Sequence, residues 1–133
     1  MNKKQLIVAC VFGILLLSGC ATGYNKRGLF GGYENRAITN NIFEVSFSGN
    51  GFLDMNKAEA LALLRCASLT LENGYGYFIV SDKISQMVFF NTKPTVKMLI
   101  QCSKEKPEDT EEKVYEAKKI KADIETKYKI KEK

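Results

Sequence analysis

The segment 54–74, DMNKAEALALLRCASLTLENG, constrains the fold more than any other part of this 133-residue chain. We predict a helix here, because Asn56 with Glu59 forms a capping box and Asn73-Gly74 supplies a left-handed stop. On a helical wheel one narrow sector holds the polar side chains, which are Lys57, Arg65, Ser68 and Glu72, with Leu61 among them. The rest of the circumference is mostly Ala and Leu, so the helix must be covered on more than one side.

Strand patterns flank this helix. Residues 42–48 alternate between apolar and polar side chains, which predicts a half-buried strand that ends at Gly49-Asn50-Gly51. Two further strands are expected over 75–83 and 84–92, joined around Ser81-Asp82-Lys83, and a last strand over 95–102. The order β-α-β-β-β predicts an α+β domain with a mostly antiparallel sheet and one buried helix.

The C-terminal region is strongly charged from Pro107 onward, but apolar residues recur in it at helical spacing. Asp109 with Glu112 forms a second capping-box pattern. We therefore predict a charged C-terminal helix over 109–128, which either packs on the domain or docks on a partner.

The first nineteen residues have the three parts of a secretory signal peptide: Lys3 and Lys4, an apolar run over 6–17, and small residues before a cleavage point. That run is short for a membrane span, which needs about 20 apolar residues. It ends in Leu17-Ser18-Gly19-Cys20, which resembles the lipobox of bacterial lipoproteins. In that motif the cysteine thiol forms a thioether to diacylglycerol and the chain is cut just before it. We predict a lipidated Cys20; the alternative is a chance cysteine after a signal anchor.

A diacylglycerol and an N-acyl chain on Cys20, palmitate among the acyl groups, would hold the protein at a bilayer without spanning it. No other cofactor is predicted. The following residue is Ala21, whereas Asp there resembles the inner-membrane retention signal of enteric bacteria, so we expect the periplasmic face of the outer membrane. Residues 20–41, rich in Gly and Asn, are predicted to be a lipidated tether, and 42–133 a single domain.

The chain contains no histidine, which excludes a Ser-His-Asp or Cys-His constellation and any His-containing zinc site. The remaining polar residues show no pairing at a recognisable catalytic spacing, so we predict neither an enzyme nor a metal site. Removing residues 1–19, which hold two lysines and no acid, lowers the net charge from +5 to +3. This small positive charge either keeps the protein soluble or favours its binding to an anionic surface. The sequence has no stripe of alternating basic and aromatic residues, so we do not predict nucleic acid as a partner.

Four motifs stand in order after the lipobox: GGY at 31–33, F-x-V-x-F-x-G-N at 43–50, LLR-x-A-x-LT at 63–70 and GY-x-YF at 74–78. Together they resemble a family of small, uncharacterised lipoproteins of Gram-negative bacteria. The likeness covers most of the span 31–80. It implies no activity, because the family has no known function. Cys66 stands where that family has a small residue, which favours a local role over a shared catalytic thiol.

Two cysteines remain in the mature domain, because Cys10 leaves with the signal peptide and Cys20 takes the lipid. Cys66 lies away from the polar sector of its helix, and Cys102 shares a strand face with apolar residues, so both are expected to face the same core. In an oxidising compartment we predict a Cys66–Cys102 disulfide. It closes a loop of about 36 residues and contributes about 3–4 kcal/mol. The alternative is two unpaired core thiols.

Three residues are candidates for contact with a ligand or partner. Arg65 is expected to pair with Glu72 or with a strand carboxylate, or to bind an anion. Tyr75 and Tyr77 belong to a group of strand aromatics that would form a platform, for example for glycan rings. That group also holds Phe78, Phe89 and Phe90. Aromatic residues in the strands of a small domain are more often core, which is the interpretation we favour.

These observations support two hypotheses of different classes. The first is a non-enzymatic outer-membrane lipoprotein that acts as an envelope structural or adaptor module, held by its acyl anchor and possessing an envelope protein partner. The second is a periplasmic ligand-binding or sensor domain that uses the aromatic strand residues. A pocket lined by those aromatics would favour the second hypothesis. A filled core with an apolar surface patch would favour the first.

Overall fold

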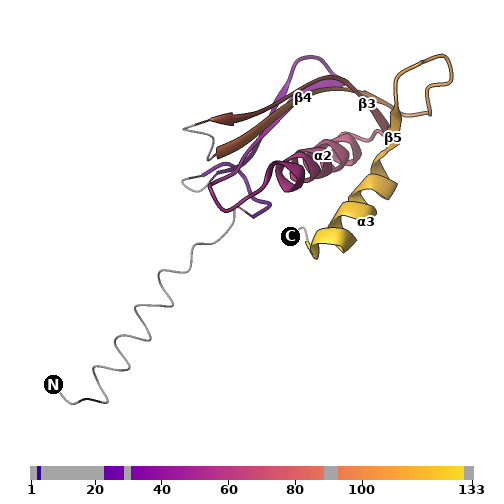
Figure 1. Cartoon of the computed structure of the whole chain (residues 1–133). Coiled ribbons are helices and arrows are strands. Elements are labelled where there is room, and N and C mark those ends of the chain that lie inside the picture. The colour runs from indigo at the N-terminus through magenta and orange to yellow at the C-terminus, as the bar shows by residue number, and fades with distance from the viewer. Residues whose placement is uncertain (1–2, 4–22, 29–30, 89–92, 131–133) are drawn as a thin grey trace.

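A computed structural model describes Lys3 and residues 23–28, 31–88 and 93–130, and their fold is α+β, as predicted. The elements in chain order are β1 (Gly32–Ala37), β2 (Ile42–Ser48), α2 (Met55–Glu72), β3 (Tyr77–Val88), β4 (Lys93–Ser103), β5 (Val114–Glu116) and α3 (Ala117–Tyr128). The strands form one sheet in the order β1-β2-β4-β3-β5, and every neighbouring pair is antiparallel. β2 and β3 both flank β4, and α2 is the crossover between them (Figure 1).

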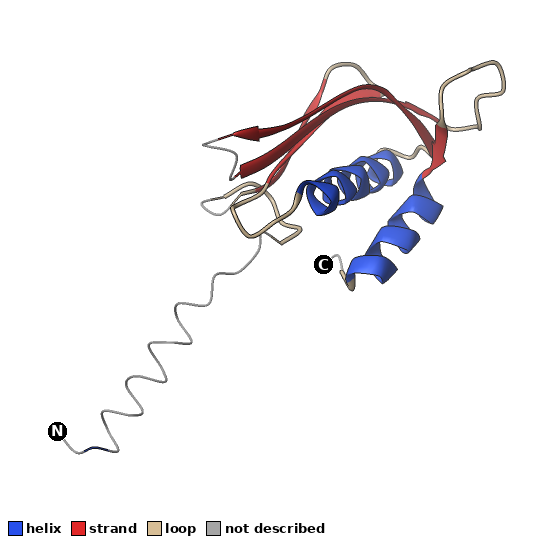
Figure 2. Ribbon diagram, in the orientation of Figure 1, coloured by secondary structure: helices blue, strands red, loops and turns tan. Residues whose placement is uncertain are grey.

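Both helices cover the same face of the sheet (Figure 2). The alternation in β2 buries Phe43, Val45 and Phe47, and the register places Val45 opposite Met98 and Phe47 opposite Val96 of β4. These side chains and the apolar side of α2 form one hydrophobic core. Burying a large apolar side chain stabilises a fold by about 1.5–3 kcal/mol, so this layer of strand and helix contacts holds the domain together.

The capping of α2 differs from the expected pattern at one end. Asp54 caps the helix, because its Oδ1 accepts a hydrogen bond from the backbone N of Lys57 at 2.9 Å. The predicted capping box at Asn56 and Glu59 is wrong, since a capping oxygen is already supplied two residues earlier. At the C-terminal end Gly74 has a φ of 81°, which confirms the left-handed stop.

β1 lies inside the segment predicted as a tether, so the prediction of a tether over 20–41 is wrong for residues 32–37. This strand lacks an apolar alternation because its inward position 35 is an asparagine. Asn35 lies opposite Val45 on β2, and its side chain accepts a hydrogen bond from Arg65 on α2. Asn35 is itself exposed, so this inward position is polar and partly open to solvent, which hides the strand from pattern analysis.

Residues 23–28 also pair with the start of β1. The backbone N of Tyr33 donates to the carbonyl of Asn25 at 2.7 Å, and the N of Arg27 donates to the carbonyl of Tyr33 at 2.7 Å. This close approach requires glycine at position 32, where φ is 128° and a Cβ atom would lie 2.4 Å from the carbonyl oxygen of Asn25. The GGY motif therefore lies at the start of β1, where residues 23–28 pack back against the sheet.

The two strands predicted over 75–92 are one strand, β3, in the part that the structure describes. The register between β3 and β4 shifts between Val80 and Asp82, which makes Ser81 a bulge residue. The polar cluster at 81–83 therefore bends the strand and does not end it. Beyond the bulge, Lys83 pairs with Glu59 of α2 at 3.2 Å, which ties the strand to the start of the helix.

The C-terminal helix is shorter than the predicted range 109–128. Residues 114–116 form β5 on the edge of β3, where the ring of Tyr115 stacks on Phe78 with centroids 5.1 Å apart. This contact holds the chain extended at the place where we expected helix. The Asp109 and Glu112 pattern lies in the loop before β5, and α3 begins only at Ala117, where it packs against α2.

Candidate functional site

Arg65 is the centre of a polar cluster between α2, β1 and residues 23–28, and it is only 7% exposed. Its Nε donates to Oδ1 of Asn35 at 3.1 Å. Its Nη1 and Nη2 donate to the two carboxylate oxygens of Glu72 at 2.9 and 3.1 Å. This is a bidentate pair, the strongest geometry for an arginine and a carboxylate. It confirms the expected pairing of Arg65 with Glu72.

Two tyrosines complete the cluster. The guanidinium carbon of Arg65 lies 4.5 Å from the ring centroid of Tyr33, and the ring of Tyr24 packs against Tyr33 at 4.9 Å. Burial by itself lowers the pKa of Arg65, but Glu72 and Tyr24 outweigh it, so the pKa is raised. The site is therefore a permanent cation enclosed by aromatic faces and one carboxylate.

We call this set the Arg65 cluster: Tyr24, Tyr33, Asn35, Arg65 and Glu72. It joins three parts of the chain, namely residues 23–28, β1 and α2. Sequence analysis found Arg65 and Glu72 but missed the other three members. The available signal was a pair of tyrosines in a segment otherwise rich in Gly and Asn, which is unusual for a free tether.

The other two candidate residues lie elsewhere. The hydroxyl of Tyr75 donates to the carbonyl of Asn40 at 3.1 Å, so Tyr75 joins the end of α2 to the turn between β1 and β2. Tyr77 lies opposite Glu116 on the edge pair of β3 and β5. Phe78 is fully buried in the core, which confirms for this residue the core position that we favoured over an aromatic platform. Phe89 and Phe90 lie outside the described residues.

Cys66 and Cys102 both face the core, as expected, but both are free thiols in this structure. The predicted disulfide is not formed in this structure, and each sulfur contacts another side chain. Sγ of Cys66 lies 3.8 Å from Sδ of Met98, and Sγ of Cys102 lies 3.3 Å from Oγ1 of Thr70. Burial raises the pKa of both thiols, so they stay protonated and unreactive at neutral pH.

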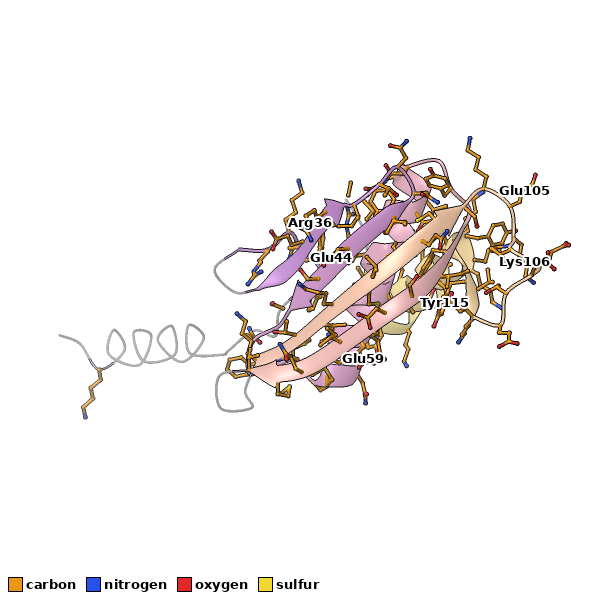
Figure 3. All side chains as sticks on the ribbon, turned by 90° about the horizontal axis from the view of Figure 1, so that it is seen from above. Arg36, Glu44, Glu59, Glu105, Lys106 and Tyr115 are labelled. Carbon is orange, nitrogen blue, oxygen red and sulfur yellow. The ribbon has the colours of Figure 1, made fainter. Side chains whose placement is uncertain are left out.

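Two open hollows lie on the surface of the described chain. The larger, about 650 Å³, is on the sheet face away from the helices, between β1, β2 and β4. There Arg36 and Lys97 both pair with Glu44, at 3.5 and 3.6 Å, and Figure 3 shows Arg36 and Glu44 side by side. The smaller, about 410 Å³, lies between the β3–β5 edge and α3 and is lined in part by Tyr77 and Tyr115.

Within residues 23–28, 31–88 and 93–130 no group of three or more acidic or cysteine side chains is arranged to hold a metal ion. In the same residues no helix is long and apolar enough to cross a membrane. The predicted lipidation site, Cys20, and the signal peptide lie outside the part of the chain that the structure describes. Among the predicted site residues that the structure describes, Arg65 has the largest set of hydrogen-bond and aromatic partners.

Comparison of the chain with protein families, with curated proteins and with solved structures found no match.

Proposed function

We propose that this chain is a lipoprotein of the outer membrane, anchored through an acylated Cys20 and facing the periplasm, that acts as a non-enzymatic structural or adaptor module of the envelope. The observation that carries this proposal is the position of the Arg65 cluster. Tyr24, which belongs to the cluster, follows Cys20 by only four residues. The fold thus begins almost at the predicted lipid, which suits a domain held close to a membrane.

The bonding of the polar groups supports a structural role. All three guanidinium nitrogens of Arg65 donate to Asn35 or Glu72, and in the larger hollow Arg36 and Lys97 both pair with Glu44. An active site instead holds polar groups that are aimed at a space for substrate. The Arg65 cluster therefore serves to join segments of the chain.

A second candidate function is ligand binding at the smaller hollow. Tyr77, one of the predicted ligand-binding residues, lines this hollow together with Tyr115, Lys113 and Lys119. An aromatic wall with basic side chains suits an anionic or glycan ligand. Loss of a ligand in a Tyr77→Ala variant, with binding retained in Tyr75→Ala, would favour this function over the adaptor role.

The anchor is tested by labelling growing Gram-negative cells with a fatty-acid analogue. We expect wild-type chain to carry the label and Cys20→Ser to lose it and to leave the membrane fraction or stay unprocessed. Cys10→Ser is the matched control and should keep the label, because Cys10 is removed with the signal peptide. Equal labelling of wild type and Cys20→Ser would contradict the anchor.

The membrane is tested by separating inner and outer membranes on a density gradient. We expect the wild-type chain in the outer membrane fraction. An Ala21→Asp variant tests the sorting position and should move to the inner membrane in an enteric host. An inner-membrane location of the wild-type chain would contradict the outer-membrane part of the proposal and leave the anchor intact.

A further inference from the structure

One end of the domain collects the start of β1, the end of β2 and the start of β4. The register pairs Gly32 with Ser48 and Ser48 with Thr95, so these residues share one end of the sheet. The loop from β2 to α2 and the start of α2 follow directly after Ser48. The last turn of α3 lies there as well, because Nζ of Lys57 is 5.7 Å from the ring centroid of Tyr128. We call this the basic end of the domain.

The N-terminal chain enters the domain at the basic end. Lys26 forms a parallel bridge with Tyr33, so residues 25–27 run in the same direction as β1. The chain before Lys26 therefore comes from beyond the start of β1. Tyr24 is four positions after Cys20, and a fully extended chain spans at most about 14 Å over that length. An acylated Cys20 therefore keeps Tyr24, where the chain enters the basic end, within that distance of the lipid.

The charge of the two ends of the domain differs in sign. The described basic side chains at the basic end are Lys26, Arg27, Lys57, Lys93, Lys127 and Lys129, and the nearby acidic ones are Glu34, Asp54, Glu59 and Glu125, so basic residues are in excess. The loop 104–113 at the opposite end has five acidic and three basic residues; Figure 3 shows Glu105 and Lys106 on it. A polarised domain of this kind turns its basic end toward an anionic surface.

An exposed aromatic residue lies at the basic end. Phe52, in the loop between β2 and α2, is 67% exposed. Its backbone N donates to the side chain of Asn50 at 3.0 Å, and its neighbour Leu53 is buried and donates to the carbonyl of Asn50 at 3.1 Å. The loop is thus fixed to the core on one side and presents the Phe52 ring on the other.

We infer that the basic end docks on an anionic phospholipid surface, with Phe52 inserted at the boundary between headgroups and acyl chains and the lysines facing the phosphates. Apolar side chains flanked by Lys and Arg bind membrane interfaces in this manner. The linker length and the charge of this end favour lipid over a protein partner. The inference rests on the proposed acyl anchor and adds the orientation of the domain, with loop 104–113 pointing away from the membrane.

The test uses the absence of tryptophan from the chain. Phe52→Trp places a single tryptophan at the basic end, and excitation at the red edge of its absorption avoids the tyrosines. Ile38→Trp is the matched control, because Ile38 is also a large exposed side chain, 48% exposed, but lies at the β1–β2 turn on the opposite end. Both variants are made as full lipidated chains in vesicles of equal parts phosphatidylcholine and phosphatidylglycerol.

We expect the emission of Phe52→Trp to shift to the blue and to be quenched by lipids with brominated acyl chains. The emission of Ile38→Trp should stay at the position of tryptophan in water and should not be quenched. Equal behaviour of the two variants on vesicles that carry the protein would overturn the inference. A blue shift of the same size on neutral phosphatidylcholine vesicles would contradict the part of the inference that gives the lysines a role in docking. Failure of the chain to sediment with vesicles would instead contradict the acyl anchor, on which the inference depends.

Discussion

Arg65 shows how one charged side chain determines where a chain segment lies. Its guanidinium is buried, and it has hydrogen-bond acceptors and an aromatic face as partners. Burial of a charge is tolerated only when such partners are present. Because those partners come from β1, residues 23–28 and α2, the arginine holds the start of the ordered chain against the core.

Replacing Arg65 with methionine tests this role. Arg65→Met keeps much of the aliphatic packing but leaves Asn35 without its donor, and we expect the free energy of unfolding to fall by about 1–3 kcal/mol. Urea unfolding of the full chain in detergent measures the change. Arg36→Met is the control, because Arg36 pairs with Glu44 on the surface at 3.5 Å and should change stability by less than about 0.5 kcal/mol. Similar unfolding midpoints for both variants would contradict the role of Arg65.

The two core cysteines allow a prediction of the number of free thiols in the mature chain. If Cys10 is removed and Cys20 is acylated, the mature chain should contain two free thiols, Cys66 and Cys102, when it is unfolded without reductant. Mass spectrometry after alkylation in denaturant gives the number, and Cys66→Ala should reduce it to one. A count of zero would mean that the two residues are bridged in the cell, and that the free thiols in this structure are the reduced form.

The raised pKa of Cys66 predicts a pH dependence of stability. Its thiol stays protonated in the folded chain, because burial and the nearby Cys102 raise its pKa, but it ionises near pH 8.5 in the unfolded chain. Above that pH the unfolded state binds fewer protons, so the free energy of unfolding falls as pH rises. Between pH 8 and pH 10 we expect a loss of about 2 kcal/mol from this group.

Unfolding under reductant at several pH values measures this dependence. Cys66→Ala removes the titrating thiol and should lose correspondingly less stability over the same range, while below pH 8 its curve should run parallel to that of the wild-type chain. Parallel curves up to pH 10 would show that Cys66 ionises normally in the folded state, and is therefore accessible to water.

At the scale of elements, two candidate N-cap residues at the start of α2, Asp54 and Asn56, can be compared directly. Asp54→Ala removes the oxygen that accepts from Lys57 and should lower the free energy of unfolding by about 1 kcal/mol. Asn56→Ala changes the residue that pattern analysis selected and should change stability by less than about 0.5 kcal/mol. Thermal unfolding of both variants distinguishes them, and the reverse order would mean that the helix begins at Lys57.

Sequence analysis located the elements whose own residues show a regular apolar pattern. β2 and α2 bury apolar side chains at regular spacing, so their pattern alone is sufficient. β1 was missed because its inward position 35 is a polar residue whose partner, Arg65, lies thirty residues later. β5 was missed because its three residues are held by Tyr115 stacking on Phe78 of another strand. Both cases depend on tertiary contacts that no local pattern records.

The same reasoning explains what was found of the site. Arg65 and Glu72 lie on one helix, so their pairing follows from helical geometry and was predicted. Tyr24 and Tyr33 join the cluster only because Gly31 and Gly32, both at positive φ, turn residues 23–28 back onto β1. The packing of residues 23–28 against β1 was not predicted.

At the scale of the whole molecule, the folded domain and its predicted lipid are joined by a short stretch that the Arg65 cluster fixes. Lys26 and Arg27 are trypsin sites between the two, and cleavage there would release the domain from the membrane. The backbone N of Arg27 is bonded to Tyr33, and its side chain pairs with Glu34 at 3.1 Å. A protease therefore needs this segment to open before it can cut.

Tyr24→Ala should increase that opening, because it removes the aromatic contact with Tyr33 and the interaction with Arg65. We expect trypsin to release the domain from washed membranes several-fold faster than in the wild type, since about 1 kcal/mol of lost local stability corresponds to roughly a five-fold larger open population. The readout is a soluble fragment that begins at Arg27 or Gly28, identified by its mass. Tyr75→Ala is the matched control, because it also removes a tyrosine with a tertiary hydrogen bond, but at the opposite end of the domain. Equal release from both variants would show that residues 23–28 are a free tether. The Arg65 cluster would then not hold the domain close to the membrane.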